Sequence, residues 1–174
     1  MIYFIADTHF GDASFIPFDQ RPFKDLNEMD TTIIKNCNDV VTDDDTLIIN
    51  GDFAIPGENT VKHIANQLNG KKILVRGNHD TLDEEVYTSC GIKVIDYPII
   101  LDEFYIVSHY PMHINPAGPY VNIFAHVHGN PMYKTVSSRS FCTSCSRIAY
   151  APVSFNTVKR MINDQFKREI DNGC

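Results

Sequence analysis

The chain has 174 residues, a formal charge of −7, and 43% hydrophobic against 21% charged residues. This length and composition predict one globular domain, residues 1–174, with a sizeable core. The acidic balance argues against a broad nucleic-acid surface, because such surfaces neutralise phosphates with Lys and Arg. The five cysteines form no even disulfide framework, and no charged-then-apolar leader precedes the first apolar run. We therefore expect a cytoplasmic protein without membrane contact.

Five apolar runs each end in a polar cluster; they cover residues 1–6, 46–50, 73–75, 104–107 and 121–125. Continuous aliphatic runs are typical of buried parallel strands, and ligands collect beyond the carboxyl ends of such strands. Five of the seven histidines stand at these ends, together with Asp and Asn. These side chains are ligands for divalent metals held by nitrogen and oxygen. The pattern predicts that the strand ends meet at a metal site.

Between these runs, helices alternate with strands early in the chain and β-runs dominate later. Apolar residues at helical spacing predict crossover helices over 25–41 and 59–68 and a closing helix over 154–170. Further short strands are predicted over 92–95, 99–101 and 140–147, with Asp102 and Glu103 as a hairpin turn. This order favours an α/β fold in which two sheets pack face to face with helices outside.

The polar clusters follow one another in a recognisable order. They read Asp7-x-His9, Gly51-Asp52, Gly77-Asn78-His79-Asp80, His109 and His126-x-His128. This order resembles the calcineurin-like metallophosphoesterase superfamily over residues 7 to 128, and the chain looks like its small single-domain members. The resemblance implies a four-layer α/β/β/α sandwich of two mixed sheets.

The resemblance also implies a binuclear centre of two divalent ions, Mn²⁺ first, with Fe, Zn, Ni or Co as alternatives. The expected ligands are Asp7, His9 and His128 for one ion, Asn78, His109 and His126 for the other, and Asp52 for both. Such a pair neutralises charge on a phosphoryl group and generates a nucleophile at neutral pH, here a bridging hydroxide.

Two residues after the third predicted strand are candidates for catalysis without metal binding. His79 resembles the family's general acid, which protonates the leaving alkoxide. For Asp80 two roles stay open: a hydrogen bond that orients the His79 ring, or a helix cap.

Four residues near the motifs are candidate substrate contacts, namely Arg21, Arg76, His113 and Asp12. Arg21 equally suits an ion pair with Asp19 or Asp25. Arg76 equally suits an ion pair at its strand end, and His113 is more simply a surface histidine. Asp12 stands where close relatives often have a third early histidine. Cys142 and Cys145 form a lone CxxC pair, which is expected to be a plain strand or turn pair because a zinc site would need a second pair.

The leading functional hypothesis is a binuclear-metal phosphodiesterase acting on a small phosphodiester or nucleotide derivative. Gly51-Asp52 is not followed by the Asp-Arg-Gly of Ser/Thr protein phosphatases, which weakens a phosphoprotein substrate. A phosphomonoesterase acting on a small phosphorylated metabolite or nucleotide is the alternative. A non-catalytic metal-binding interaction module is the alternative from another class. The sequence does not distinguish the native metal pair, the physiological substrate or the oligomeric state.

Overall fold

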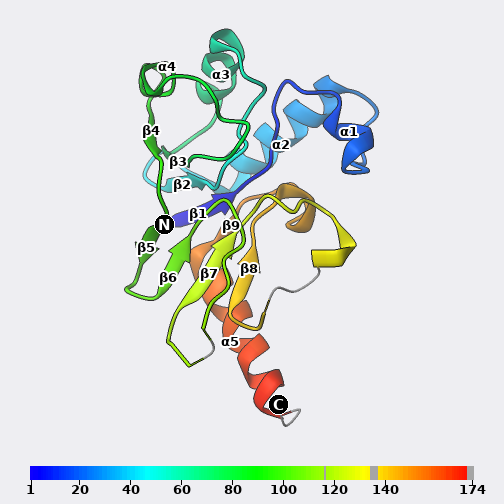
Figure 1. Ribbon diagram of the computed structural model, residues 1–174. Helices are drawn as coiled ribbons and strands as arrows, with labels where there is room; N and C mark the ends of the chain where they lie inside the picture. The colour runs from blue at the N-terminus through cyan, green and yellow to red at the C-terminus, as the bar shows by residue number, and fades with distance from the viewer. Residues whose placement is uncertain (116, 134–136, 172–174) are drawn as a thin grey trace.

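The computed structural model describes residues 1–115, 117–133 and 137–171 (Figure 1). The first half contains β1 (Ile2–Ile5), α1 (Phe15–Phe18), α2 (Leu26–Val40), β2 (Thr46–Ile49), α3 (Glu58–Ala65), β3 (Lys71–Val75), α4 (Glu84–Thr88) and β4 (Ile92–Ile95). The second half contains β5 (Ile99–Leu101), β6 (Tyr105–Val107), β7 (Val121–Phe124), η1 (Pro131–Tyr133), β8 (Ser140–Cys142), η2 (Cys145–Arg147), β9 (Val153–Ser154) and α5 (Phe155–Asp171).

The first sheet has the strand order β4-β3-β2-β1-β9. Its first four strands are parallel, and β9 pairs antiparallel with β1. Successive side chains of these strands point to opposite faces, as the period of a strand requires. Leu47 and Ile49 accordingly join one apolar cluster and Ile48 joins the other. Apart from the exposed Met1, the predicted runs over 1–6, 46–50 and 73–75 are thus covered on both faces, which is why they are continuous rather than alternating.

The second sheet has the order β5-β6-β7-β8. The β5–β6 pair is antiparallel, and the other two pairs are parallel. Asp102 and Glu103 join β5 to β6 with φ of 44° and 65°. Two positive φ values in succession are typical of a tight hairpin turn, so this predicted turn is confirmed.

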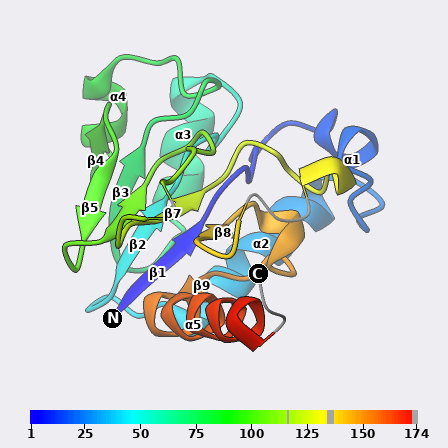
Figure 2. The same cartoon turned by 60° about the horizontal axis from the view of Figure 1, so that its bottom comes forward.

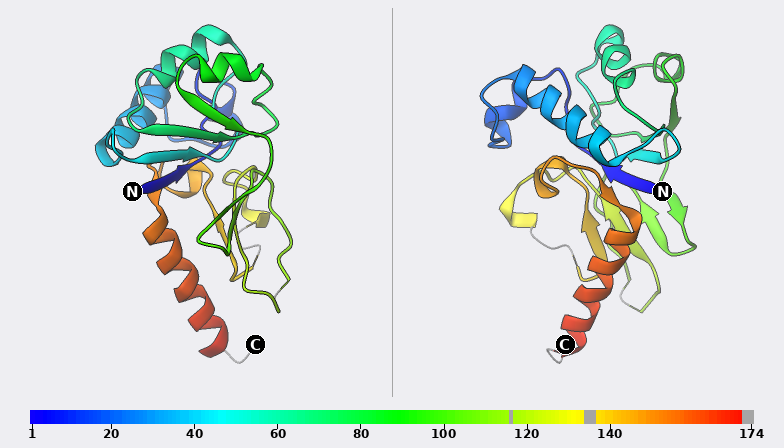
Figure 3. Two further views of the ribbon diagram at one scale, coloured as in Figure 1. Left: turned by 90° about the vertical axis from the view of Figure 1, so that its left-hand side faces the viewer. Right: turned by 180° about the vertical axis from the view of Figure 1, so that it is seen from behind.

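Helices α2, α3 and α4 cover the face of the first sheet that points away from the second sheet (Figure 3). The apolar residues of α2 at helical spacing, Met29, Ile33 and Cys37, are all buried there. The other apolar cluster lies between both sheets and α5, whose Phe155, Val158 and Ile162 contribute to it. Figure 2 shows α5 running beside β9 and β1. Two mixed sheets with helices confirm the predicted α/β class.

Several predicted elements differ in detail. Residues 92–95 are a strand, but β4 extends the parallel first sheet after the unpredicted helix α4, rather than opening the β-rich second half. The predicted strand over 140–147 ends at Cys142, and a 3-10 helix follows it. The short α1 was not among the predicted helices. Within the described residues, none of the helices has both the length and the apolar character needed to cross a membrane.

Candidate metal centre

The carboxyl ends of five strands bring the predicted ligands together. Asp7 and His9 follow β1, Asp52 follows β2, Asn78 follows β3, His109 follows β6, and His126 and His128 follow β7. These strands belong to two different sheets, so strand order alone does not explain why their ends meet.

Asn50, the residue after β2, connects the two sheets at this point. It is fully buried, and its side-chain amide donates to the backbone carbonyls of Ser108 (2.9 Å) and Ile123 (3.3 Å) in the second sheet. The backbone carbonyl oxygen of Asn50 lies 2.9 Å from Nδ1 of His109. A neutral His109 that donates from Nδ1 keeps Nε2 free for a metal. Nothing in the sequence marks Asn50, because an Asn at a strand end usually belongs to a turn.

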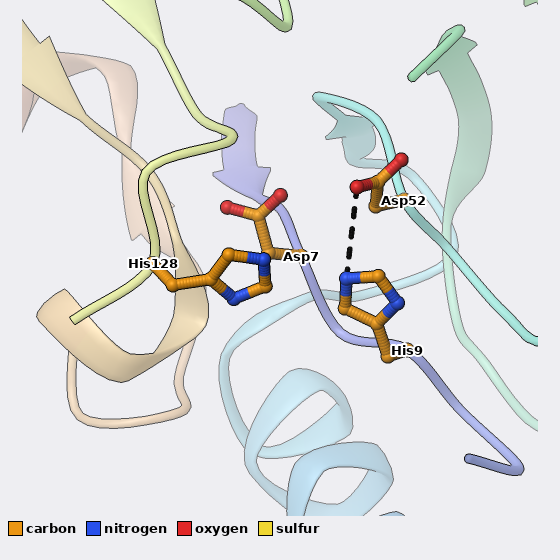
Figure 4. Close-up of side chains that lie close together, drawn as sticks. All are labelled: Asp7, His9, Asp52 and His128. Carbon is orange, nitrogen blue, oxygen red and sulfur yellow. Dashed lines mark ion pairs between the residues drawn. The ribbon is translucent and has the colours of Figure 1, made fainter. Parts of the chain in front are cut away.

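The first ligand group consists of Asp7, His9, Asp52 and His128 (Figure 4). One potential ligand atom from each lies within 4.8 Å of the others. Nε2 of His9 is 3.6 Å from Oδ2 of Asp52. Asp7, His9 and Asp52 are at most 2% exposed. The four side chains therefore surround a small, water-poor space with nitrogen and oxygen atoms.

The second ligand group consists of Asp52, His109 and His126. Nε2 of His109 lies 3.4 Å from Oδ2 of Asp52 and 3.1 Å from Oδ1 of Asn78. Asn78 is exposed and His126 is partly exposed, so this group opens toward solvent. Asp52 belongs to both groups, which is the geometry a bridging carboxylate requires.

The chemistry of these atoms fits two divalent cations. Nε2 of His9 and Oδ2 of Asp52 are buried and have no hydrogen-bond partner among the described residues. Buried polar atoms are normally paired, so these two call for a ligand. Burial lowers the pKa of His9 to about 2, which leaves its ring neutral and able to coordinate. Burial alone would raise the pKa of Asp52, but the neighbouring His109 ring and the backbone N–H of His79 bring it to about 2.

The backbone at these positions is strained. Five predicted ligands have positive φ: Asp7 (51°), His9 (48°), Asp52 (55°), His126 (72°) and His128 (48°). Non-glycine residues seldom adopt this conformation, and it persists where surrounding structure and function demand it. Here the positive φ values occur where Asp7, His9, His126 and His128 are brought around the shared carboxylate of Asp52.

Two glycines allow the loops to approach closely. A Cβ at Gly51, whose φ is +90°, would lie 2.1 Å from Nδ1 of His109. A Cβ at Gly77 would lie 2.3 Å from Oδ1 of Asp52. Any side chain at either position would displace a predicted ligand.

Asp7 is held by residues from the second half of the chain. Its carboxylate accepts hydrogen bonds from the hydroxyl of Ser144 and from the backbone N–H of His126 (3.0 Å to Oδ2). Burial raises its pKa, opposed by His128 and His109. Cys145 donates its thiol to the Asp7 carbonyl at 3.2 Å, and burial raises the pKa of that thiol to about 12. The CxxC pair thus contributes packing around Asp7, in agreement with the expectation of a plain pair.

Asp80 has neither of the two roles considered for it. Its buried carboxylate accepts from the backbone N–H groups of Asp52 (2.7 Å), Phe53 (2.9 Å) and Gly77 (2.8 Å). No hydrogen bond joins it to the His79 ring among the described residues, and α4 begins only at Glu84. Asp80 instead fixes the loop that carries Asp52, because three donors converge on one carboxylate.

Asp19 and Arg21 support the first group, and the sequence indicated Asp19 only as an ion-pair partner of Arg21, not as a contact of His128. Oδ2 of Asp19 lies 3.4 Å from Nδ1 of His128, and Oδ1 accepts from the N–H of Gly129 at 2.8 Å. Arg21 is 4% exposed, donates to the carbonyls of Asp7 (2.6 Å) and Thr8 (2.8 Å), and lies 3.5 Å from Asp19. For Arg21 the structure shows the ion pair with Asp19 that was left open.

His79 is positioned over the site but does not join either ligand group. Its N–H donates to Oδ1 of Asp52 at 2.9 Å, and its ring meets the His9 ring edge-on with centroids 4.9 Å apart. The residue is exposed, so its imidazole is open to a bound ester. This placement is compatible with the general acid role, which stays a prediction.

The other candidate substrate contacts lie elsewhere. Arg76 pairs with Asp96 at 2.6 Å and donates to the carbonyls of Asp80 and Leu82, as its ion-pair alternative required. Asp12 accepts from the N–H and hydroxyl of Ser14. His113 is exposed on the loop after β6 and belongs to neither ligand group.

Two candidate ligand groups with a shared carboxylate, at the meeting point of two mixed sheets, are consistent with the class of metal-dependent phosphoesterases. The family model described as "Calcineurin-like phosphoesterase" matches residues 1–144. The chain therefore belongs to the calcineurin-like phosphoesterase family, whose members are metal-dependent phosphoester hydrolases.

Other comparisons extend over most of the chain. The uncharacterized protein MJ1445 of Methanocaldococcus jannaschii is 33% identical over 172 residues, covering 92% of this chain and 90% of that protein. A crystal structure of the protein of unknown function AQ665 from Aquifex aeolicus is similar with a TM-score of 0.70 and 25% identity, covering 92% of this chain and 98% of that one. The nuclease MPE of Pseudomonas putida has a TM-score of 0.44 and 26% identity, covering 73% of this chain and 61% of that one.

Proposed function

We propose that the protein is a phosphodiesterase that hydrolyses a small phosphodiester or nucleotide derivative and uses both ligand groups. The shared carboxylate of Asp52 carries this proposal. Asp7, His9 and His128 would hold one divalent ion, and Asn78, His109 and His126 the other. Two ions held there would neutralise the phosphoryl charge and activate the nucleophile.

The chain's own residues then contribute positioning and proton transfer. The buried first group keeps water away from one side of the phosphoryl group, which strengthens electrostatic interactions there. His79, exposed beside His9, would give a proton to the leaving oxygen. The hydrogen bond from the backbone N–H of His79 to the Asp52 carboxylate fixes the His79 backbone relative to the ligand groups.

The two arginines near the site, Arg21 and Arg76, are already bound to other protein groups, which favours a diester substrate over a monoester. A monoester is a dianion near neutral pH, and sites for it often add a guanidinium fork. Both arginines considered for this role, Arg21 and Arg76, are committed to protein carbonyls and carboxylates. A diester has one negative charge fewer and needs no such fork.

The test is hydrolysis of bis(p-nitrophenyl) phosphate and p-nitrophenyl phosphate by the Mn²⁺-loaded protein. We expect the larger kcat/KM for the diester. A larger kcat/KM for the monoester would show a phosphomonoesterase. Full metal occupancy without turnover of either ester under Mn, Fe, Zn, Ni or Co would show a non-catalytic metal-binding module.

A further inference from the structure

A groove of about 750 Å³ extends from His126 and His128, one residue from each ligand group, along one edge of the molecule. Its lining includes His126 and His128 at the metal end, and Phe18 and Tyr133 farther away. Phe18 is the last residue of α1 and Tyr133 the last of η1. Figures 1 and 3 place α1 and η1 at the same edge, away from β4 and β5. The volume is that of a small-molecule site.

Two aromatic side chains line this groove and are accessible to solvent. Phe18 is 70% exposed and Tyr133 is 48% exposed. Phe18 meets the ring of His128 edge-on with centroids 5.7 Å apart. The aromatic lining of the groove therefore begins directly beside a predicted ligand. Exposed aromatic faces next to a reaction centre are typical of stacking surfaces for flat ligands.

The two sides of the groove are fixed to each other. Arg147 donates to the carbonyls of His128, Asn130 (2.8 Å) and Tyr133 (2.7 Å), and so holds η1 in place. Asp19, next to Phe18, accepts from the N–H of Gly129 at 2.8 Å. The groove is thus formed before a ligand binds, which lowers the entropic cost of binding.

The charge of the groove restricts what it accepts. Apart from the two predicted ligands, Asp19 is the one charged side chain among the described lining residues, and none of these residues is Lys or Arg. A second phosphate is therefore unfavourable there. The exposed Gln20 and Asn130 amides offer donors and acceptors, which suit the edge of a heterocycle.

We propose that the groove binds a nucleobase, stacked on Phe18 and Tyr133, while the phosphoryl group of the same nucleotide lies at the metal centre. This assignment rests on the proposed function and narrows its substrates to nucleotide esters. A flat, uncharged ring with a polar edge matches the aromatic faces, the amides and the absence of Lys and Arg from the described lining residues.

The experiment measures binding rather than turnover. AMP and ribose 5-phosphate are titrated into the Mn²⁺-loaded protein by calorimetry, since they share the phosphate and sugar and differ only in the base. We expect AMP to bind roughly 5- to 150-fold tighter, the range for stacking of one base. The Phe18→Leu and Tyr133→Leu variants should each lose part of this ratio.

Phe104→Leu is the matched control. Phe104 is 40% exposed and lies at the opposite end of β6 from His109, so its variant should keep the wild-type ratio. Equal binding of AMP and ribose 5-phosphate by the wild type would overturn the assignment, as would phenyl phosphate binding as tightly as AMP. The proposed function fails on a different result, the absence of ester hydrolysis, so the two failures are distinguishable.

Discussion

The two ligand groups share Asp52 but are held in different ways. The first group is enclosed: His9 stacks on the buried ring of Phe15, and His128 lies against Asp19, which in turn pairs with Arg21. The second group is open, with Asn78 exposed and His126 beside the half-exposed ring of Tyr110.

This difference indicates that the two ligand groups have different roles. Buried, preorganised ligands hold an ion firmly, because little reorganisation accompanies binding and water is excluded. An open group leaves room for a substrate oxygen to approach. We expect the first group to bind its ion more tightly and the second to contact substrate.

The largest effect is expected at the shared carboxylate. Asp52→Asn removes the one anion common to both groups, so both ions should be lost, and kcat/KM should fall at least about 10³-fold. Metal content by elemental analysis, together with the diester assay, measures this. Asp44→Asn, in an exposed turn, is the control. Two ions per chain with ordinary turnover in Asp52→Asn would contradict the ligand assignment.

His79→Ala should separate proton transfer from metal binding. Because His79 lies outside both ligand groups, the variant should keep both ions while its rate falls by about 10² to 10⁴. The loss should be smaller for a p-nitrophenolate leaving group, which is a stable anion, than for the alkoxide of a nucleotide diester. Equal losses on both substrates would argue for phosphate binding instead of acid catalysis.

Asp19→Asn should affect the first group alone. Asn keeps the size of the side chain but removes the charge next to His128 and Arg21, so one ion should bind about 10- to 100-fold more weakly. Chelator competition on the protein resolves the two affinities. Asp39→Asn, which breaks a surface pair with Lys35, should change neither affinity. Weakening of both ions together would show a general loss of structure.

The smallest effect concerns Asp30, which accepts from the N–H of Gly11 just after His9. Burial raises the pKa of Asp30 from 3.8 to about 6. The folded state therefore holds this proton more tightly than the unfolded state, and stability contributed by the protonated form is lost as pH rises from about 4 to 6.

Asp30→Asn keeps an acceptor for Gly11 but cannot ionise. It should therefore be more stable than the wild type above pH 6, by on the order of 1 kcal/mol, with the advantage fading toward pH 4. Urea unfolding of the metal-free proteins at several pH values measures this difference. An advantage that is constant across the range would mean that ionisation of Asp30 is not its cause.

The sequence by itself determined which residues are brought together. Each candidate ligand follows an apolar run, so local burial predicted that the strand ends would meet at a metal site, and the order of the motifs resembled a family whose pattern implied the ligand set. The same periodicity predicted α2, α3 and α5 within a few residues of their observed ends. These features depend on neighbours along the chain, which the sequence displays directly.

Only the tertiary structure decided how the ligands are supported. Asp80 accepts hydrogen bonds from backbone N–H groups that lie 27 and 28 residues earlier in the chain. Asp19 accepts from the N–H of Gly129, which lies 110 residues later. Ser144 donates to Asp7, and 137 residues separate the two. Hydrogen bonds between residues so far apart in the chain depend on how the two sheets are joined. Asn50 joins the sheets by donating to backbone carbonyls, which every residue type has. Backbone partners carry no side-chain signature, so no pattern along the chain reveals them.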